Sequence, residues 1–147
     1  MRSLRCGLIG LLGVTLTAAL AGQAPGAELL ATGEQARSAW VAGDFPALVS
    51  GVTRLQLRLP GLDPSAAIGQ AQAVALLRSY VRGTIELGVA VEGAREVGPN
   101  RGFVELLRRY RLEGTQEERT ETVLLGYRRS PATRTWRLVE LRVAPGT

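Results

Sequence analysis

The sequence predicts an α+β domain in which N-terminal helices pack on one face of a curved antiparallel sheet. Two observations lead to this prediction. Before Gly83, apolar residues recur mostly at helical spacing, whereas from Thr84 onward they fall in strand-like runs separated by turn residues. Helices that come first and strands that follow as a meander are typical of this fold class.

Residues 1–21 of the 147-residue chain have the pattern of a secretory signal peptide. Arg2 and Arg5 precede an uncharged apolar core, and Ala19-Leu20-Ala21 fits the A-x-A cleavage pattern. The alternative is a buried or membrane-spanning helix that would remain as an anchor. However, glycines and threonines dilute the core, and a span needs about 20 strongly apolar residues.

We therefore expect cleavage after Ala21 or later and export to the periplasm or the cell exterior. Residues 22–27 are expected to form a flexible lead, and residues 28–147 a single domain. Cys6 precedes the apolar core, so it is not a lipoprotein cysteine. Because Cys6 is the only cysteine, the mature chain would contain no disulfide.

Three helices are expected in the first half of this domain. An amphipathic helix spans 28–42, and Gly43 follows it. Asp44 is the expected N-cap of a short helix with Pro46 in its first turn, which explains this carboxylate better than catalysis does. The third helix spans 70–82 and ends at Gly83.

Strands account for the rest of the domain. Between the second and third helices, apolar and polar residues alternate over 52–59, as in a strand with one face in water. Later strands are expected over 85–97, 103–112, 120–129 and 134–143, with turns between them. Gly88 and Gly93 indicate bends or bulges in the first of these later strands.

The composition excludes several kinds of active site. The chain has no histidine, its basic residues are all arginine, and its only aspartates are Asp44 and Asp63. Nucleophiles, general bases and metal sites are mostly built from the side chains that are missing or scarce here. We expect no metal and no cofactor, and we identify no catalytic residue.

Three glutamates inside apolar strand segments are the remaining candidates for a buried base: Glu86, Glu105 and Glu140. Solvent exposure is the alternative for each of them. Strand alternation places Glu105 opposite the core face of Val104, Leu106, Tyr110 and Leu112, and it places Glu140 opposite Val139, Leu141 and Val143. Glu105 and Glu140 are therefore expected to face away from the interior.

The same alternation gathers apolar side chains on the outer face of the sheet, which indicates a surface for self-association as a homodimer. Scattered surface residues, or cover by a terminal segment, are the alternatives. The candidates for this face are Phe103, Leu107, Leu124, Trp136 and Leu138.

Seven arginines near the last hairpins suggest either contacts with lipid headgroups, cell-wall polymers or nucleic acid, or cross-strand ion pairs with nearby glutamates. Ion pairing is the expected outcome, and nucleic acid is not an expected partner. These arginines are Arg108, Arg109, Arg111, Arg128, Arg129, Arg134 and Arg137.

Three stretches, 40–45, 55–61 and 70–77, resemble the nuclear transport factor 2-like superfamily, also called cystatin-like or SnoaL-like. Within it, the chain is similar to a small exported bacterial family, domain of unknown function 4783. The resemblance implies a cone: a curved antiparallel sheet with helices across its concave side, often around a pocket. The aromatic candidates for such a pocket are Trp40, Tyr80, Tyr110 and Tyr127, with core packing as the alternative.

This superfamily contains both enzymes and binding modules, so the fold does not choose between them. The expected function is a non-enzymatic binding or dimerisation module. A binding module of this kind would hold a small apolar ligand. The alternative is an isomerase or dehydratase with a buried glutamate base. A closed cavity lined by a buried acid and a tyrosine would favour the enzyme, whereas an all-apolar or collapsed interior would favour the module.

Overall fold

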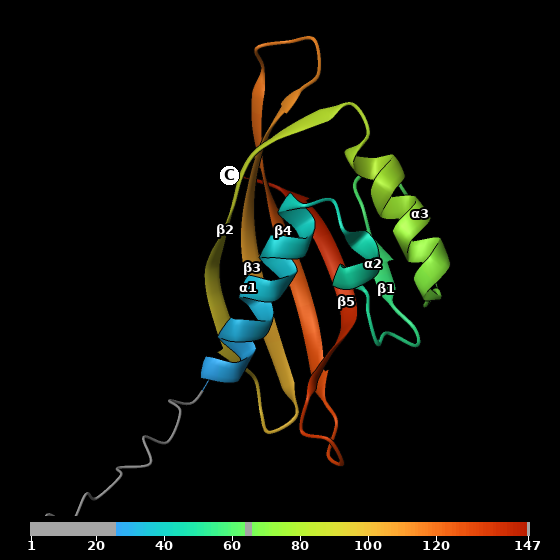
Figure 1. The fold of residues 1–147 in the computed structure, drawn as a ribbon, viewed down its shortest axis with the longest axis vertical. Coiled ribbons are helices and arrows are strands. Elements are labelled where there is room, and N and C mark those ends of the chain that lie inside the picture. Colours follow the sequence, from blue (N-terminus) through green and yellow to red (C-terminus); the bar gives the residue numbers. More distant parts are fainter. Residues whose placement is uncertain (1–25, 64–65, 147) are drawn as a thin grey trace, which may run out of the picture.

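The computed structural model describes residues 26–63 and 66–146 (Figure 1). The expected signal segment, its cleavage position, Cys6 and most of the 22–27 lead lie outside the described residues. No helix in the described part of the chain is long and apolar enough to cross a membrane.

Three helices and five strands make up the described residues. The helices are α1 (Ala27–Val41), α2 (Phe45–Leu48) and α3 (Gln70–Val81). The strands are β1 (Gln56–Arg58), β2 (Thr84–Glu96), β3 (Arg101–Leu112), β4 (Glu118–Arg129) and β5 (Trp136–Pro145). The strands form one sheet in the order β1-β5-β4-β3-β2, with β1 parallel to β5 and the other neighbours antiparallel.

The helices cover one side of the curved, unclosed sheet, so the predicted α+β architecture is confirmed (Figure 1). Helix α1 lies across β2 and β3, while α2, α3 and β1 lie toward the β5 edge. Register shifts beside Gly88 and Gly93 confirm the predicted bulges in β2.

The strand expected over 52–59 is shorter than predicted. Leu55, Leu57 and Leu59 are buried and Gln56 and Arg58 are exposed, as the alternation predicts. However, only 56–58 pair with β5, because Leu55 instead pairs with Ile68 in an isolated bridge. The shorter strand still contributes its leucines to the core.

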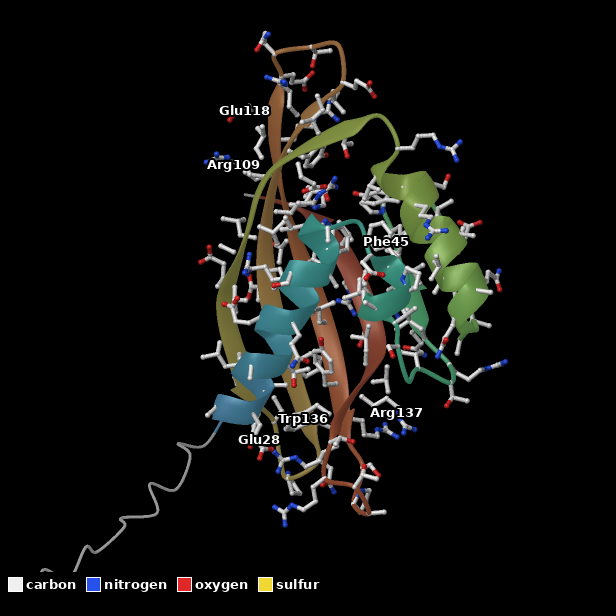
Figure 2. All side chains as sticks on the ribbon, viewed as in Figure 1. Glu28, Phe45, Arg109, Glu118, Trp136 and Arg137 are labelled. Atoms are coloured by element: carbon white, nitrogen blue, oxygen red, sulfur yellow. The ribbon has the colours of Figure 1, made fainter. Side chains whose placement is uncertain are left out.

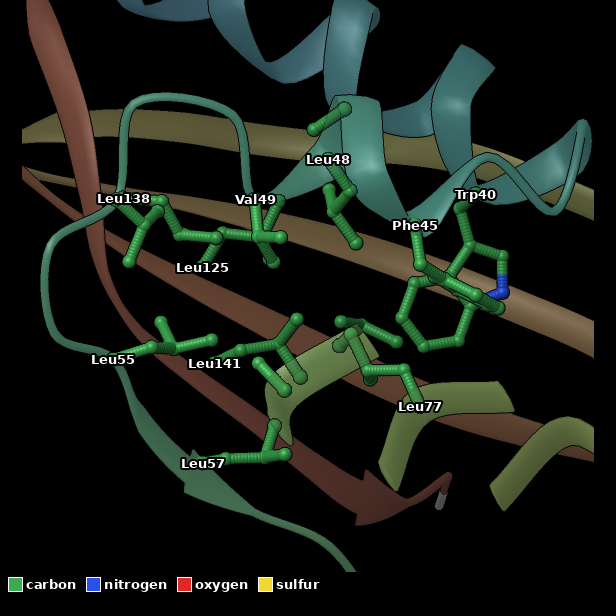
Figure 3. Packing of buried hydrophobic residues seen from close by; sticks show 14 of the residues in the cluster. Trp40, Phe45, Leu48, Val49, Leu55, Leu57, Leu77, Leu125, Leu138 and Leu141 are labelled. Carbon is green, nitrogen blue, oxygen red and sulfur yellow. The ribbon is translucent and has the colours of Figure 1, made fainter. Parts of the chain in front are cut away.

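Helix α1 buries one stripe against the sheet: Leu29, Gly33, Ala36 and Trp40. A Cβ atom at Gly33 would lie 2.7 Å from Cγ1 of the fully buried Val104, so the glycine allows α1 to approach β3 closely. The core continues from Trp40 and Phe45 to the leucines of β1, α3, β4 and β5 (Figure 3).

The helix caps position the segment between α1 and β1. Asp44 accepts a hydrogen bond from the backbone N–H of Ala47 at 3.1 Å, as expected of an N-cap. This cap starts the turn that buries Phe45 and Leu48 beside Trp40. The structural role predicted for Asp44 is therefore confirmed.

Candidate functional site

The central feature of the concave side is a buried arginine. Arg108, on β3, is 1% exposed and is directly paired with Glu121 on β4 in the sheet register. Its Nη1 donates to Glu121 Oε2 at 3.0 Å, and its Nε donates to Glu86 Oε1 at 2.8 Å. Its Nη2 donates to Thr84 Oγ1 at 2.8 Å and also to Glu86. The guanidinium thus joins β2 and β4 through two carboxylates.

Aromatic rings surround this guanidinium. Its central carbon lies 4.1 Å from the ring centroid of Tyr110, 5.6 Å from that of Trp40 and 6.0 Å from that of Tyr80. At these distances a desolvated cation is attracted to each ring. The Tyr80 hydroxyl also donates to Glu121 Oε1 at 2.6 Å. We call Arg108, Glu86, Glu121 and Tyr80 the arginine cluster.

The surroundings of Arg108 and Tyr80 fix the protonation states of these two side chains. Burial by itself lowers the pKa of Arg108, but hydrogen bonds and attraction from Glu86 and Glu121 outweigh it and raise the pKa. Burial, followed by the hydrogen bond to Glu121 and its charge, raises the pKa of Tyr80 far above its ordinary value. Tyr80 is therefore a neutral donor and Arg108 a cation at any physiological pH.

A pocket of about 490 Å³ opens onto one side of the arginine cluster. Glu121 and Tyr80 form part of its wall, so their hydrogen bond borders the pocket. We call it the cluster pocket, and its lining residues are Pro60, Tyr80, Tyr110, Arg119, Thr120, Glu121, Pro145 and Gly146.

A second pocket of about 390 Å³ lies beneath α1 and α2, where Tyr127, Trp136 and Leu138 face Ala36 and Leu48. Burial raises the pKa of Tyr127 far above its ordinary value. Of the four predicted pocket aromatics, Trp40, Tyr80 and Tyr110 thus lie around Arg108, while Tyr127 lies at this separate pocket.

Neither a family model nor a curated protein sequence matches the chain. Solved structures, in contrast, do match the chain. A ketosteroid isomerase-like protein from Erwinia carotovora atroseptica matches with a TM-score of 0.68 and 18% identity, over 83% of this chain and 96% of that one. A DUF4783 family protein from Bacteroides uniformis matches with a TM-score of 0.62 and 12% identity, over 78% and 96%.

An NTF2-like protein with a cystatin-like fold from Novosphingobium aromaticivorans matches with a TM-score of 0.57 and 19% identity, over 80% of this chain and 79% of that one. The chain has the nuclear transport factor 2-like fold. The resemblance drawn from three short stretches of sequence is therefore confirmed at the level of the fold, and the solved structures include members of the unknown-function family named with it.

On this nuclear transport factor 2-like fold, the three candidate glutamates lie on different sides of the sheet. Glu86 points to the concave side and pairs with Arg108. Glu105 is exposed, and Glu140 lies on the outer face beside Gly126 and Phe103. The expectation that Glu105 and Glu140 avoid the interior is confirmed. Among the described residues, no group of three or more His, Cys, Asp or Glu is arranged to hold a metal.

The outer-face prediction is wrong for two residues. Leu138 is 4% exposed and lines the pocket with Tyr127, and Trp136 lines the same pocket. The reason is a register shift between Gly126 and Tyr127: Gly126 pairs with Glu140, but Tyr127 pairs with Leu138, so Val139 is an extra residue. Strand alternation does not carry across such a bulge. Phe103, Leu107 and Leu124 do lie on the outer face of the nuclear transport factor 2-like sheet, where each is half-buried.

Sequence reasoning missed the burial of Arg108 and Glu121, although a signal existed. Arg108 has the same strand parity as Val104, Leu106 and Tyr110, which were predicted to form the core face. The charge of Arg108 nevertheless argues against burial, because arginine is rarely buried unless it is paired. The expected cross-strand ion pairing is confirmed for Arg108 with Glu121.

Tyr127 provides a test of the electrostatics. Its folded-state pKa lies above the unfolded value of 10.0, so its contribution to stability is complete below pH 10 and is lost as the pH rises further. Relative to Tyr127→Phe, the wild type should lose up to about 1.4 kcal/mol of unfolding free energy per pH unit above pH 10. Urea unfolding between pH 8 and 11.5 measures this, and a pH-independent difference between the two proteins would contradict it.

Proposed function

We propose that the chain is a non-enzymatic binding module that holds a small ligand in the cluster pocket. The observation that carries this proposal is that both carboxylate oxygens of Glu121 already accept hydrogen bonds. Tyr80 occupies one of its carboxylate oxygens and Arg108 the other. A general base must be able to reach the proton that it abstracts. An acid held in this way is better suited to position a wall of the pocket than to accept a proton.

The lining, which also includes Arg119 and Thr120, supports a ligand with both apolar and polar parts. Pro60, Tyr110 and Pro145 offer apolar surface, while Tyr80 and Glu121 lie together at the wall. Pockets of this size and mixed lining are typical of small-molecule sites. Export of the module is part of the proposal, and its support is the signal-like sequence of residues 1–21.

Native mass spectrometry of the purified protein tests the proposal, because it reports a retained small molecule directly. Tyr80→Phe removes the hydroxyl at the cluster pocket and should reduce the ligand-bound fraction. Tyr127→Phe removes a hydroxyl at the second pocket and is the matched control, which should retain the ligand. A wild type that carries no small molecule after native-condition purification, or equal loss from both variants, would count against the cluster pocket.

The alternative function is an isomerase or dehydratase that uses Glu121 or Glu86 as its base. Two observations favour it: Glu121 is 5% exposed beside tyrosines at a pocket, and one solved structure of the same fold is a ketosteroid isomerase-like protein. A β,γ-unsaturated ketosteroid is the probe, and the absorbance of the conjugated product is the readout. Turnover that disappears in Glu121→Gln or in Glu86→Gln, but not in Glu105→Gln, would replace the binding proposal with this one.

We further propose that the outer face of the sheet mediates a homodimer, now without Trp136 and Leu138. Phe103, Leu107 and Leu124 remain there, and a two-fold contact would use the same patch on both subunits. Sedimentation at micromolar concentration should show a dimer that Leu124→Glu dissociates. A strictly monomeric wild type would refute this assembly.

A further inference from the structure

Three arginines lie side by side at the end of the outer sheet face where β4 turns into β5, and a fourth lies close to two of them. Arg128 on β4 is directly paired with Arg101 on β3 and with Arg137 on β5. Directly paired residues of neighbouring strands point to the same side of the sheet. Tyr127 and Leu138, the adjacent pair, are buried on the concave side, so the three arginines point outward.

The fourth arginine, Arg54, precedes β1. Together with Arg128 and Arg137 it lines a pocket of about 340 Å³, which we call the arginine pocket. Its other lining residues are Thr53, Ser130, Leu138 and Val139. Figure 2 shows Arg137 at the same end of the sheet as Trp136, with its nitrogens directed away from the core.

In the part of the chain that the structure describes, the three arginines that line the arginine pocket form no ion pair with their neighbours on the sheet. Within the described residues, no carboxylate oxygen lies within 4.0 Å of a side-chain nitrogen of Arg54, Arg128 or Arg137. The acid nearest along β5, Glu140, pairs with Arg142 at 3.0 Å. The cross-strand ion pairing predicted for Arg128 and Arg137 is therefore wrong, because the register places arginine opposite arginine.

Like charges directly opposite each other destabilise a sheet. Strands in a sheet lie about 4.8 Å apart, so the Cα atoms of the row Arg101–Arg128–Arg137 span only about 10 Å. Such a row loses its repulsion when an anion lies between the guanidinium groups. Guanidinium donates two parallel hydrogen bonds to phosphate oxygens, and the hydroxyls of Thr53 and Ser130 add neutral donors at the same pocket.

We propose that the arginine pocket binds a phosphate group, held between Arg54, Arg128 and Arg137. This site shares no lining residue with the cluster pocket and is independent of the proposed ligand. A soluble phosphate ester and an anionic phospholipid headgroup present the same group, and the experiment separates these two sources.

The test uses glycerol 3-phosphate as the soluble probe in calorimetric titration at low salt. Vesicles of phosphatidylcholine with and without phosphatidylglycerol form the second arm. Arg137→Gln and Arg128→Gln should each weaken binding about tenfold, the loss expected for one charge-assisted contact. Arg78→Gln, an exposed arginine on α3 with the same change in charge, is the matched control and should bind like the wild type.

Binding of glycerol 3-phosphate assigns a soluble source, and binding of phosphatidylglycerol vesicles alone assigns a headgroup, provided that Arg137→Gln and Arg128→Gln weaken it. Absence of binding in both arms, or equal weakening by Arg78→Gln, overturns the proposal. Weaker binding can be distinguished from a folding defect by the melting temperature. Relief of repulsion should leave the melting temperature of Arg137→Gln unchanged or raised. A clear fall in that temperature would show that Arg137 has a structural partner, and this too would overturn the proposal.

Discussion

Arg108→Ala is expected to lower the free energy of unfolding by about 3–5 kcal/mol. The substitution leaves Glu86 and Glu121 without their shared cation. Glu121 is buried, and a buried carboxylate that loses its partner keeps its desolvation cost, which exceeds the value of the ion pair itself. The loss also removes the guanidinium from between the rings of Trp40 and Tyr110. Urea unfolding monitored by circular dichroism measures the change.

The neighbouring arginine supplies the control. Arg109 is exposed on the outer face, so Arg109→Ala should change the unfolding free energy by no more than about 0.5 kcal/mol. A similar small effect of Arg108→Ala would mean that the cluster is not a structural unit.

A rescue experiment separates lost charge from lost packing. In Arg108→Met combined with Glu86→Gln and Glu121→Gln, no charge remains to be buried, and the methionine fills part of the space. Replacement of a buried ionic group by uncharged residues of similar volume is often neutral or stabilising. We expect the triple variant to be more stable than Arg108→Met alone. If it is less stable, the hydrogen bonds rather than the uncompensated charges dominate.

The arginine cluster also shows which part of the site could be predicted from sequence. Alternation along β3 identifies Val104, Leu106 and Tyr110 as core residues, and the structure confirms all three. The same alternation places Arg108 between them. What the sequence lacks is the register that brings Glu121 opposite Arg108 and the bulge in β2 that brings Glu86 beside it. Without known partners, a buried arginine is physically implausible.

The incorrect predictions for Leu138 and for the pairing of Arg128 and Arg137 have a common origin. Local patterns predict the order of helices and strands well, because periodicity within one segment reflects burial of that segment. Bulges and pairings depend on two strands at once. The extra residue at Val139 moves Leu138 to the concave side, and the pairing of Arg128 with Arg137 replaces an expected ion pair with like charges. The pocket lined by Leu138 and Tyr127 lies beside this bulge, and the arginine pocket lies at this pairing, so neither could be located from the sequence.

Trp40→Ala is expected to cost about 3–5 kcal/mol of unfolding free energy. Trp40 is 1% exposed and meets Phe45 edge to face at a centroid distance of 5.5 Å (Figure 3). It joins α1 to α2 and also covers the Arg108 guanidinium. The truncation therefore leaves a large cavity at the centre of the core and uncovers a buried cation. Trp136→Ala, at the half-buried tryptophan, is the comparison and should cost less.

The comparison with Trp40→Phe identifies what the tryptophan contributes. Its Nε1 is buried without a hydrogen-bond partner among the described residues. An unsatisfied buried donor costs about 1–3 kcal/mol, and phenylalanine removes that donor while it keeps most of the ring. Trp40→Phe should therefore cost less than half as much as Trp40→Ala in the same urea experiment. Equal costs of the two substitutions would contradict this account of the indole nitrogen.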